Sequence, residues 1–202
     1  MAKLSITTFL SLDGVMQAPG GPGEDPSGGF DSGGWSVPYG DDDFGRFATE
    51  VFDRSGAFLL GRRTYEIFAG YWPKMTDPDD PIASRLNSLP KYVASTTLDH
   101  ADWAGTTVIG TDLVREVTDI KRRTEGEVQI HGSGSLARSL MAHDLIDTFH
   151  LLFFPVVLGK GLRLFADDAV PTALRHTEAR TTSTGVAIHT YELAGRPTYG
   201  SY

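Results

Sequence analysis

The sequence predicts an α/β fold: a central, mostly parallel sheet flanked by helices, with an antiparallel hairpin near the C-terminus. Two observations predict it. Apolar, β-forming segments alternate with helix-like segments along the chain, which is typical of a parallel sheet. The last two predicted strands are separated only by Ser183-Thr184-Gly185, a hairpin-like turn. Neither an internal repeat nor a domain boundary is evident, so we expect residues 1–202 to form a single domain.

In the first half, residues 3–12 predict a strand that ends at Asp13-Gly14. Residues 19–40 are rich in glycine, which is typical of a functional loop or a disordered one, and Trp35 and Tyr39 favour a loop that docks onto the core. The helix that follows is predicted from capping aspartates at 41–43 and from apolar residues at helical spacing, Phe44, Phe47, Ala48, Val51 and Phe52. Residues 57–60 predict a buried strand, 63–68 a short helix and 73–81 a polar turn region.

The second half repeats the alternation. Predicted strands cover residues 92–94, 106–109, 127–130 and 148–158, and Pro155 in the last of them indicates an edge strand or a bulge. One predicted helix is capped by Thr111 or Asp112, and a second covers residues 136–141. The hairpin is predicted over residues 173–182 and 186–193.

Composition excludes several functional classes. The chain has 202 residues, no cysteine, and a net charge of −8 from 18 basic and 26 acidic residues. It therefore has no disulfides or thiolate chemistry, and it is too acidic for non-specific nucleic-acid binding. The six histidines show no metal-ligand spacing. Without a long apolar run or a signal-peptide pattern, we expect no membrane partner and a cytoplasmic location.

The turn at Gly132 matches the pattern G-x-G-x-x-A, between a predicted strand and a predicted helix. Glycines let a backbone approach a pyrophosphate, and a helix N-terminus offers free N–H groups. No acidic residue follows about 20 residues later, as an ordinary dinucleotide-binding domain requires. The motif alone leaves a phosphate site and a ligand-free turn equally open.

The turn at Gly61 has the same layout of strand, glycine and helix start, and it carries Arg62 and Arg63. Guanidinium groups suit phosphate oxygens because they are planar, permanently charged and bidentate. The alternative is that both arginines are solvated or pair with surface carboxylates. With the turn at Gly132, this one suggests a dinucleotide held at two places.

Five stretches together carry a family resemblance. They run across nearly the whole chain: Ser11-Leu12-Asp13-Gly14-Val15, Leu60-Gly61-Arg62-Arg63-Thr64-Tyr65-Glu66, Val93-Ala94-Ser95-Thr96-Thr97, His131-Gly132-Ser133-Gly134-Ser135-Leu136 and Pro155-Val156-Val157-Leu158-Gly159-Lys160-Gly161. In these stretches and in their order the chain resembles the dihydrofolate reductase superfamily, and most closely its branch similar to the C-terminal reductase domain of riboflavin biosynthesis.

The resemblance implies an NADPH-dependent reductase with a dihydrofolate-reductase-like fold, often a homodimer. It implies cofactor contacts at three places: phosphates at Gly61, Arg62, Arg63 and Thr64, the adenosine ribose and its 2′-phosphate at Ser95 and Thr96, and the pyrophosphate and nicotinamide side at Gly132, Ser133, Gly134, Ser135 and Leu136. It also accounts for the missing acidic residue, because this fold holds its cofactor differently.

For the substrate, the resemblance implies that Asp13 lies near the nicotinamide, where it could orient a polar group or relay a proton; otherwise Asp13-Gly14 is a turn. Trp35 and Tyr39 form either a stacking wall or a clamp that pins the loop. Asp41 matches the acidic substrate residue of dihydrofolate reductases only with a one-residue shift; otherwise it caps a helix. His131 either donates to the substrate or is structural.

These observations predict hydride transfer from NADPH to a C=N or C=O of a small heterocyclic substrate resembling a pterin or a pyrimidine. The alternative is a nucleotide- or ligand-binding protein that kept the pocket and lost the chemistry. A chain without cysteine has no deaminase zinc site, so it carries at most the reductase half of a bifunctional riboflavin enzyme.

Overall fold

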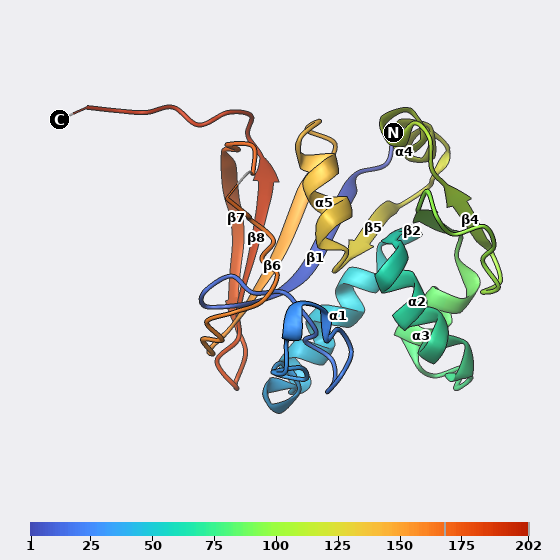
Figure 1. Cartoon of the computed structure of the whole chain (residues 1–202), viewed down its shortest axis with the longest axis horizontal. Coiled ribbons are helices and arrows are strands. Elements are labelled where there is room, and N and C mark those ends of the chain that lie inside the picture. The colour runs from blue at the N-terminus through green and yellow to red at the C-terminus, as the bar shows by residue number, and fades with distance from the viewer. Residues whose placement is uncertain (168, 202) are drawn as a thin grey trace.

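Eight strands form one sheet in the order β4-β3-β2-β5-β1-β6-β8-β7 in a computed structural model that describes residues 1–167 and 169–201 (Figure 1). The strands are β1 (Leu4–Ser11), β2 (Ser55–Gly61), β3 (Lys91–Ala94), β4 (Thr106–Ile109), β5 (Glu127–His131), β6 (Thr148–Phe154), β7 (Leu174–Thr181) and β8 (Ala187–Leu193).

The first six strands pair in parallel, and β8 and β7 add to β6 as an antiparallel hairpin. This confirms the predicted fold class. Because the carboxyl ends of parallel strands meet at one edge, the segments that follow β1, β2, β3 and β5 all begin at that edge. The arrangement places the predicted site residues of those segments on one side of the molecule.

Helices cover both faces of the sheet. They are α1 (Asp42–Asp53), α2 (Arg62–Tyr71), α3 (Pro81–Ser88), α4 (Leu113–Arg123) and α5 (Gly134–Met141). The apolar side chains of α4 and α5 pack with Leu4, Ile6 and Leu10 of β1 on one face. On the other face α1 packs with the end of β6, and α2 and α3 pack with β2 and β3. None of the helices in the described ranges is long and apolar enough to cross a membrane.

One helix was not predicted, and one predicted feature is wrong. The predicted polar turn region of residues 73–81 ends where α3 begins, at Pro81, capped by the Asp80 carboxylate, which accepts from the Ile82 and Ala83 N–H groups. Proline is well suited to the first turn of a helix, so it starts this one. Strand β6 is internal, between β1 and β8, and ends at Phe154. Pro155 therefore terminates a central strand; it does not mark an edge or a bulge.

The glycine-rich loop is docked onto the core. Trp35 is buried, and its indole N–H donates to the Gln17 carbonyl at 2.7 Å. The Trp35 ring meets Phe154 edge-on, with ring centroids 5.4 Å apart. Such an aromatic pair stabilises the folded protein by about 1 kcal/mol more than the burial of its surface area alone. The loop thus closes over one end of the sheet instead of hanging free as a linker.

Candidate functional site

The two strand-to-helix turns lie side by side. The Gly61 N–H donates to Ser133 Oγ at 3.0 Å, which joins the end of β2 to the start of α5. A Cβ atom added at Gly61 would lie 3.6 Å from the Ser133 Cβ, and one added at Gly132 would lie 3.8 Å from Thr64 Oγ1. Neither α2 nor α5 has a side-chain cap. Two helix N-termini with free N–H groups therefore open at one place.

The turn before α5 depends on its small residues. Gly132 and Ser133 both adopt left-handed backbone conformations, with φ of 56° and 54°. This conformation is free for glycine but costs about 1 kcal/mol for serine. The Ser133 hydroxyl offsets that cost because it donates to the His131 carbonyl at 3.0 Å while accepting from Gly61. One side chain thus holds both turns in register.

Arg62 reaches the segment after β3. Its Nη1 donates to Thr97 Oγ1 at 2.6 Å, and its Nε pairs with Glu66 at 2.7 Å. The Ser95 hydroxyl accepts from the Thr97 and Leu98 N–H groups and so shapes this segment. The structure therefore brings Arg62 beside the predicted residues Ser95 and Thr96. Thr97 was not predicted; it stands in the same run of hydroxyl residues.

Arg63 is engaged by the glycine-rich loop. Its Nη1 lies 2.6 Å from Asp25 Oδ2 and 3.0 Å from Ser27 Oγ. Desolvation raises the pKa of Asp25, but hydrogen bonds from Ser27 and Arg63 outweigh it, so the pKa lies below its usual value. The ion pair fastens the loop to the first turn of α2. Sequence reasoning missed Asp25 because no local pattern joins residues 38 positions apart.

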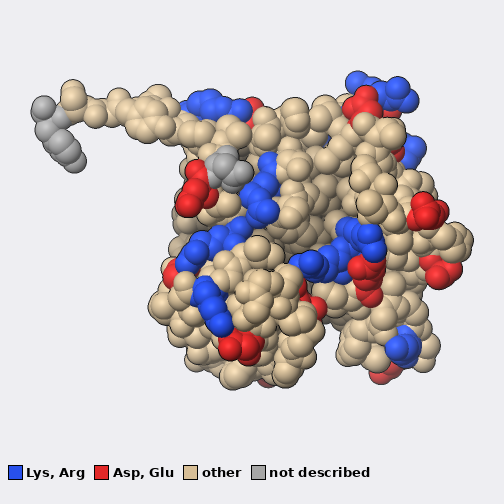
Figure 2. All heavy atoms as spheres, in the orientation of Figure 1, with Lys and Arg blue, Asp and Glu red and all other residues tan. Residues whose placement is uncertain are grey.

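Further cations lie near the start of α5. Arg138 donates to Ser135 Oγ at 3.3 Å and to the Arg163 carbonyl at 3.0 Å, and Arg163 donates to the Asp13 carbonyl. Basic side chains border a hollow on this face of the molecule (Figure 2). The chain carries a net charge of −8, so this gathering of cations is opposite in sign to the charge of the molecule as a whole.

Asp13 organises a turn. Its carboxylate accepts from Ser11 Oγ at 2.7 Å and from the N–H groups of Leu158 and Gly159 at 3.1 and 2.8 Å. The Ser11 hydrogen bond and these backbone donors lower the pKa of Asp13 to about 2. A proton relay at neutral pH requires a raised pKa. The geometry therefore favours Asp13 as the residue that orders the turn after β6.

The predicted substrate residues of the loop have structural partners. Trp35 pins the loop, as described, and the Tyr39 ring packs edge-on against Phe154. Asp41 caps α1 by accepting from the Phe44 N–H at 2.8 Å. Its other oxygen accepts from Ser183 and Thr184 in the β7–β8 turn. The Phe44 hydrogen bond, with those of the turn, holds the pKa of Asp41 far below its usual range.

His131 is a core histidine. Its ring stacks on Phe52 with centroids 4.5 Å apart, and its Nε2 lies 3.2 Å from Gln129 Oε1. The Gln129 amide nitrogen donates to the Val51 carbonyl at 2.6 Å, which leaves the amide oxygen to accept from His131. Burial, with a smaller contribution from His150, lowers the pKa of His131 to about 3. The imidazole is therefore neutral, with its proton on Nε2. Of the alternatives stated above, the structural one fits.

Leu136 lies in the first turn of α5, where a Cβ atom added at Gly61 would lie 3.7 Å from its own Cβ. Its side chain is buried in the core between the sheet and α5. Gly134, at the first position of α5, faces Met16, because a Cβ atom added there would lie 2.6 Å from the Met16 sulfur. The first turn of α5 is therefore flanked by Met16 as well as by Arg138. Met16 was not predicted, and its sequence gives no signal beyond its place after β1.

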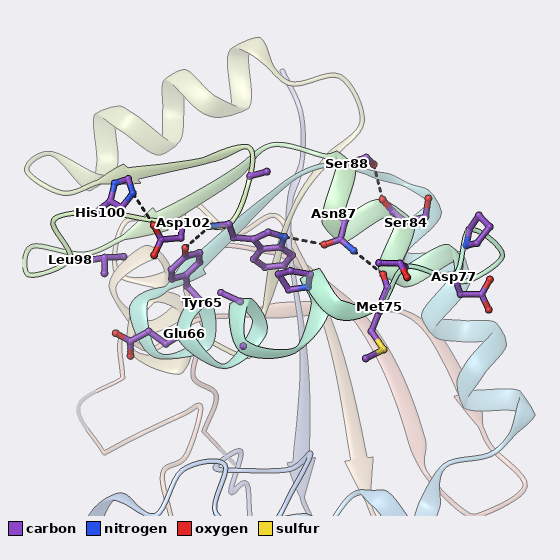
Figure 3. Close-up of a pocket in the computed structure, with 17 residues that line it drawn as sticks. Tyr65, Glu66, Met75, Asp77, Ser84, Asn87, Ser88, Leu98, His100 and Asp102 are labelled. Atoms are coloured by element: carbon purple, nitrogen blue, oxygen red, sulfur yellow. Dashed lines mark hydrogen bonds and ion pairs between the residues drawn. The ribbon is translucent and has the colours of Figure 1, made fainter.

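A cavity of about 1030 Å³ lies on the far side of α2 and contains none of the predicted site residues. In Figure 3, Tyr65 and Glu66 lie at one end of the cavity, and Met75 and Asp77 lie at the other. The polar groups of its wall are satisfied internally: the Tyr65 hydroxyl accepts from the Trp103 N–H, and Asn87 accepts from the Trp103 indole. Two residues connect the two places: Glu66 lines the cavity and pairs with Arg62, and Leu98 lines the cavity and donates its N–H to Ser95.

Comparison with solved structures supports the fold. A putative riboflavin biosynthesis protein from Shewanella sp. PV-4 superposes with a TM-score of 0.67 at 19% identity, covering 96% of this chain and 99% of that one. A pyrimidine reductase-like protein from Corynebacterium diphtheriae gives 0.62 at 15%, covering 95% and 92%. Dihydrofolate reductase from Enterococcus faecalis, complexed with NADP(H), gives 0.60 at 16%, covering 95% and 96%. The fold is therefore dihydrofolate-reductase-like.

Sequence comparison identifies the family. The chain is 31% identical over 195 residues to the uncharacterized protein YyaP of Bacillus subtilis (strain 168), covering 96% of each. The family model of the RibD C-terminal domain matches residues 2–188. Because this model spans nearly the whole chain, the chain belongs to the RibD C-terminal domain family.

Proposed function

We propose that this protein is an NADPH-dependent reductase that transfers a hydride to a C=N or C=O of a small pyrimidine- or pterin-like heterocycle. The observation that carries the proposal is the hydrogen bond between Gly61 and Ser133, which places two uncapped helix N-termini beside Arg62 and Thr97. This arrangement suits a ligand with a bridging diphosphate and one additional phosphate.

The residues present fit such a cofactor. Glycines at 61 and 132 leave open the space that a Cβ atom would fill between the two turns. The first-turn N–H groups of α2 and α5 would bind the diphosphate, and Arg62 with Ser95, Thr96 and Thr97 would bind the 2′-phosphate. NADPH, when bound, supplies the hydride. The chain itself would align donor and acceptor and exclude water.

The substrate class rests on the family and on neighbouring structures. The RibD C-terminal family and the pyrimidine reductase-like neighbour support a pyrimidine-type ring. Asp41 is committed to the β7–β8 turn. We therefore assign the substrate to the space above the β1 and β5 ends, and we give Asp41 no part in binding it.

A second function is favoured by one observation. Both candidate acidic groups, Asp13 and Asp41, accept hydrogen bonds from backbone N–H groups, and the pKa of each is lowered. Neither is suited to deliver a proton at neutral pH. This favours, as the competing proposal, a nucleotide-binding protein without reductase chemistry.

Two experiments test these proposals in order. Isothermal titration with NADPH and NADH tests the cofactor: we expect saturable binding with preference for NADPH, and absence of binding to both removes both proposals. Stopped-flow measurement of NADPH oxidation, against a panel of pterins, deaminated pyrimidines and quinones, then separates them. Oxidation with any ring of the panel supports the reductase, whereas binding without oxidation supports the nucleotide-binding protein.

A further inference from the structure

A pair of histidines lies on the β7–β8 hairpin, in a part of the fold that the proposed function does not use. His189 Nδ1 and His176 Nε2 are 3.2 Å apart. The two residues come from neighbouring antiparallel strands, and a bulge between His176 and Glu178 shifts their register so that the rings meet diagonally. We propose that this pair is a binding site for a divalent transition-metal ion of the zinc, nickel and copper group.

The spacing matches metal coordination. Zinc–nitrogen bonds of 2.0–2.1 Å at tetrahedral angles place two ligand nitrogens about 3.3 Å apart. In this structure the contact between the two nitrogens is a hydrogen bond, so one of them carries a proton. A neutral imidazole can carry its proton on either ring nitrogen, so a change of tautomer in that ring frees both lone pairs for one ion. No backbone movement is needed to bring the two nitrogens to this distance.

Neighbouring rings hold the imidazoles in place. Tyr191 stacks on His189 at an interplanar angle of 25°, and its ring centroid is 5.2 Å from that of His176. Phe153 packs edge-on against His189 from the adjoining strand. Side chains whose rotamers are fixed by packing lose little entropy when they bind, so this support favours chelation.

The surroundings select the kind of ion. The carboxylates of the hairpin are paired with cations: Glu178 with Arg180, and Glu192 with Lys3 and Arg175. Within residues 1–167 and 169–201, no group of three or more histidine or carboxylate ligands is assembled for a metal. The site therefore offers two imidazoles and leaves the other positions to water. Imidazole suits zinc, nickel and copper, whereas magnesium and calcium prefer oxygen.

Binding would fasten the edge strand β7 to β8. Two ligands on one rigid hairpin act as a chelate, so losing either one should weaken binding about a hundredfold. An ion that binds only the folded hairpin also raises the melting temperature, by an amount that grows with the logarithm of the ion concentration once this exceeds the dissociation constant. These two effects can be measured without any cofactor or substrate, so the inference is independent of the reductase proposal.

The test uses full-length protein without an affinity tag. Isothermal titration with Zn²⁺ and with Ni²⁺ should give one site per chain, and Mg²⁺ should give none. The variants His176→Asn and His189→Asn should each lose that binding about a hundredfold. The matched control His100→Asn, which alters an exposed histidine paired with Asp102, should retain it.

Three outcomes overturn the proposal: no saturable binding to either ion, binding that survives in both hairpin variants, or binding that is lost in His100→Asn instead. The metal-free variants must keep the wild-type melting temperature. Should one of them fail to fold, broadening by Ni²⁺ of the His176 and His189 ring signals in the wild-type NMR spectrum decides the matter. Absence of selective broadening there contradicts the site.

Discussion

The turns at Gly61 and Gly132 lie side by side but are built in different ways. The turn at Gly61 brings two arginines, and both guanidinium groups already have partners, Glu66 and Thr97 for Arg62 and Asp25 for Arg63. The turn at Gly132 brings small residues in left-handed conformations and no cation of its own. The turn at Gly61 thus offers charged side chains, and the turn at Gly132 offers backbone N–H groups.

The difference teaches how each turn can fail. Anion binding by charged side chains, as at Gly61, depends on those side chains and tolerates changes of backbone conformation. Anion binding by backbone N–H groups, as at Gly132, depends on the φ angles and on the absence of Cβ atoms. Each prediction below perturbs one turn and leaves the other as an internal reference.

The largest effect is expected from Gly132→Val. A β-branched residue at a φ of 56° is strained, and its side chain would enter the space beside Thr64. We expect a loss of about 3 kcal/mol in the free energy of unfolding and loss of measurable NADPH binding. Urea unfolding and isothermal titration measure the two effects. Gly45→Val, on the exposed side of α1 where nothing lies within 4 Å of a Cβ, is the control; equal losses in both variants would contradict the prediction.

Acid should weaken the turn at Gly132 first. The unfolded chain binds a proton at His131 near pH 6.5, but burial lowers the folded pKa to about 3. Stability therefore falls as the pH drops below about 6.5 and continues to fall to about 3, by about 2 kcal/mol at pH 5 for this group alone.

Hydrogen exchange at pH 7 and pH 5 can localise this loss. Amides of residues 132–136 should lose protection before those of residues 61–64, and His131→Phe should flatten the pH dependence. The exposed residue His143 supplies the control variant, His143→Asn, which should leave the dependence unchanged. Equal loss of protection at both turns would contradict a local effect.

Arg62→Ala should separate NADPH from NADH. Removing a charge-assisted contact to a phosphate costs about 1.4 kcal/mol, or about tenfold in affinity, and NADH lacks the phosphate concerned. Titration of both nucleotides checks the result. Arg63→Ala is the matched comparison: Arg63 pairs with the largely buried Asp25, whereas Glu66, the partner of Arg62, is half exposed, so the effect of Arg63→Ala on NADPH should be smaller. An equal loss for the two nucleotides would remove Arg62 from the 2′-phosphate site.

The smallest effect is expected at Ser133. Ser133→Ala removes the hydrogen bonds to Gly61 and His131 and keeps the left-handed strain, so it should cost about 1 kcal/mol in unfolding free energy. Ser133→Gly removes the same bonds but relieves the strain, so it should cost less. Urea unfolding compares the two. If glycine is the more destabilising, the hydroxyl is not what holds the turns together.

Much of the fold was predictable because it is encoded locally. Apolar residues at helical spacing predicted α1. As expected, Asp41 is the N-cap of α1 and Asp112 is the N-cap of α4. Helix α3 escaped prediction because it has eight residues and few apolar positions, and the proline at its first position is also typical of a turn. Pro155 was misread because a proline that ends a central strand and one that marks an edge look alike in sequence.

The candidate site was predictable where glycines mark it. The adjacency of Gly61 and Gly132 follows from strand order, since β2 and β5 are neighbours. The partners of Arg62 and Arg63 were not predictable, because Thr97 and Asp25 reach them only through tertiary packing. Asp13 carries the same lesson: an Asp-Gly turn gives no sign that a chain segment 145 residues away will occupy its carboxylate.

The Arg63–Asp25 ion pair makes the glycine-rich loop and any incoming anion rivals for one guanidinium. An anion that takes the Arg63 Nη1 group, which now bonds to Asp25, would displace that carboxylate and remove one of the contacts that fasten the loop. The free energy of breaking this ion pair then lowers the anion affinity that is measured on the native chain. Removing the charge of Asp25 should therefore increase the affinity of the turn for an anion. The Asp25 carboxylate of the loop would thus compete with an incoming anion for the Arg63 guanidinium.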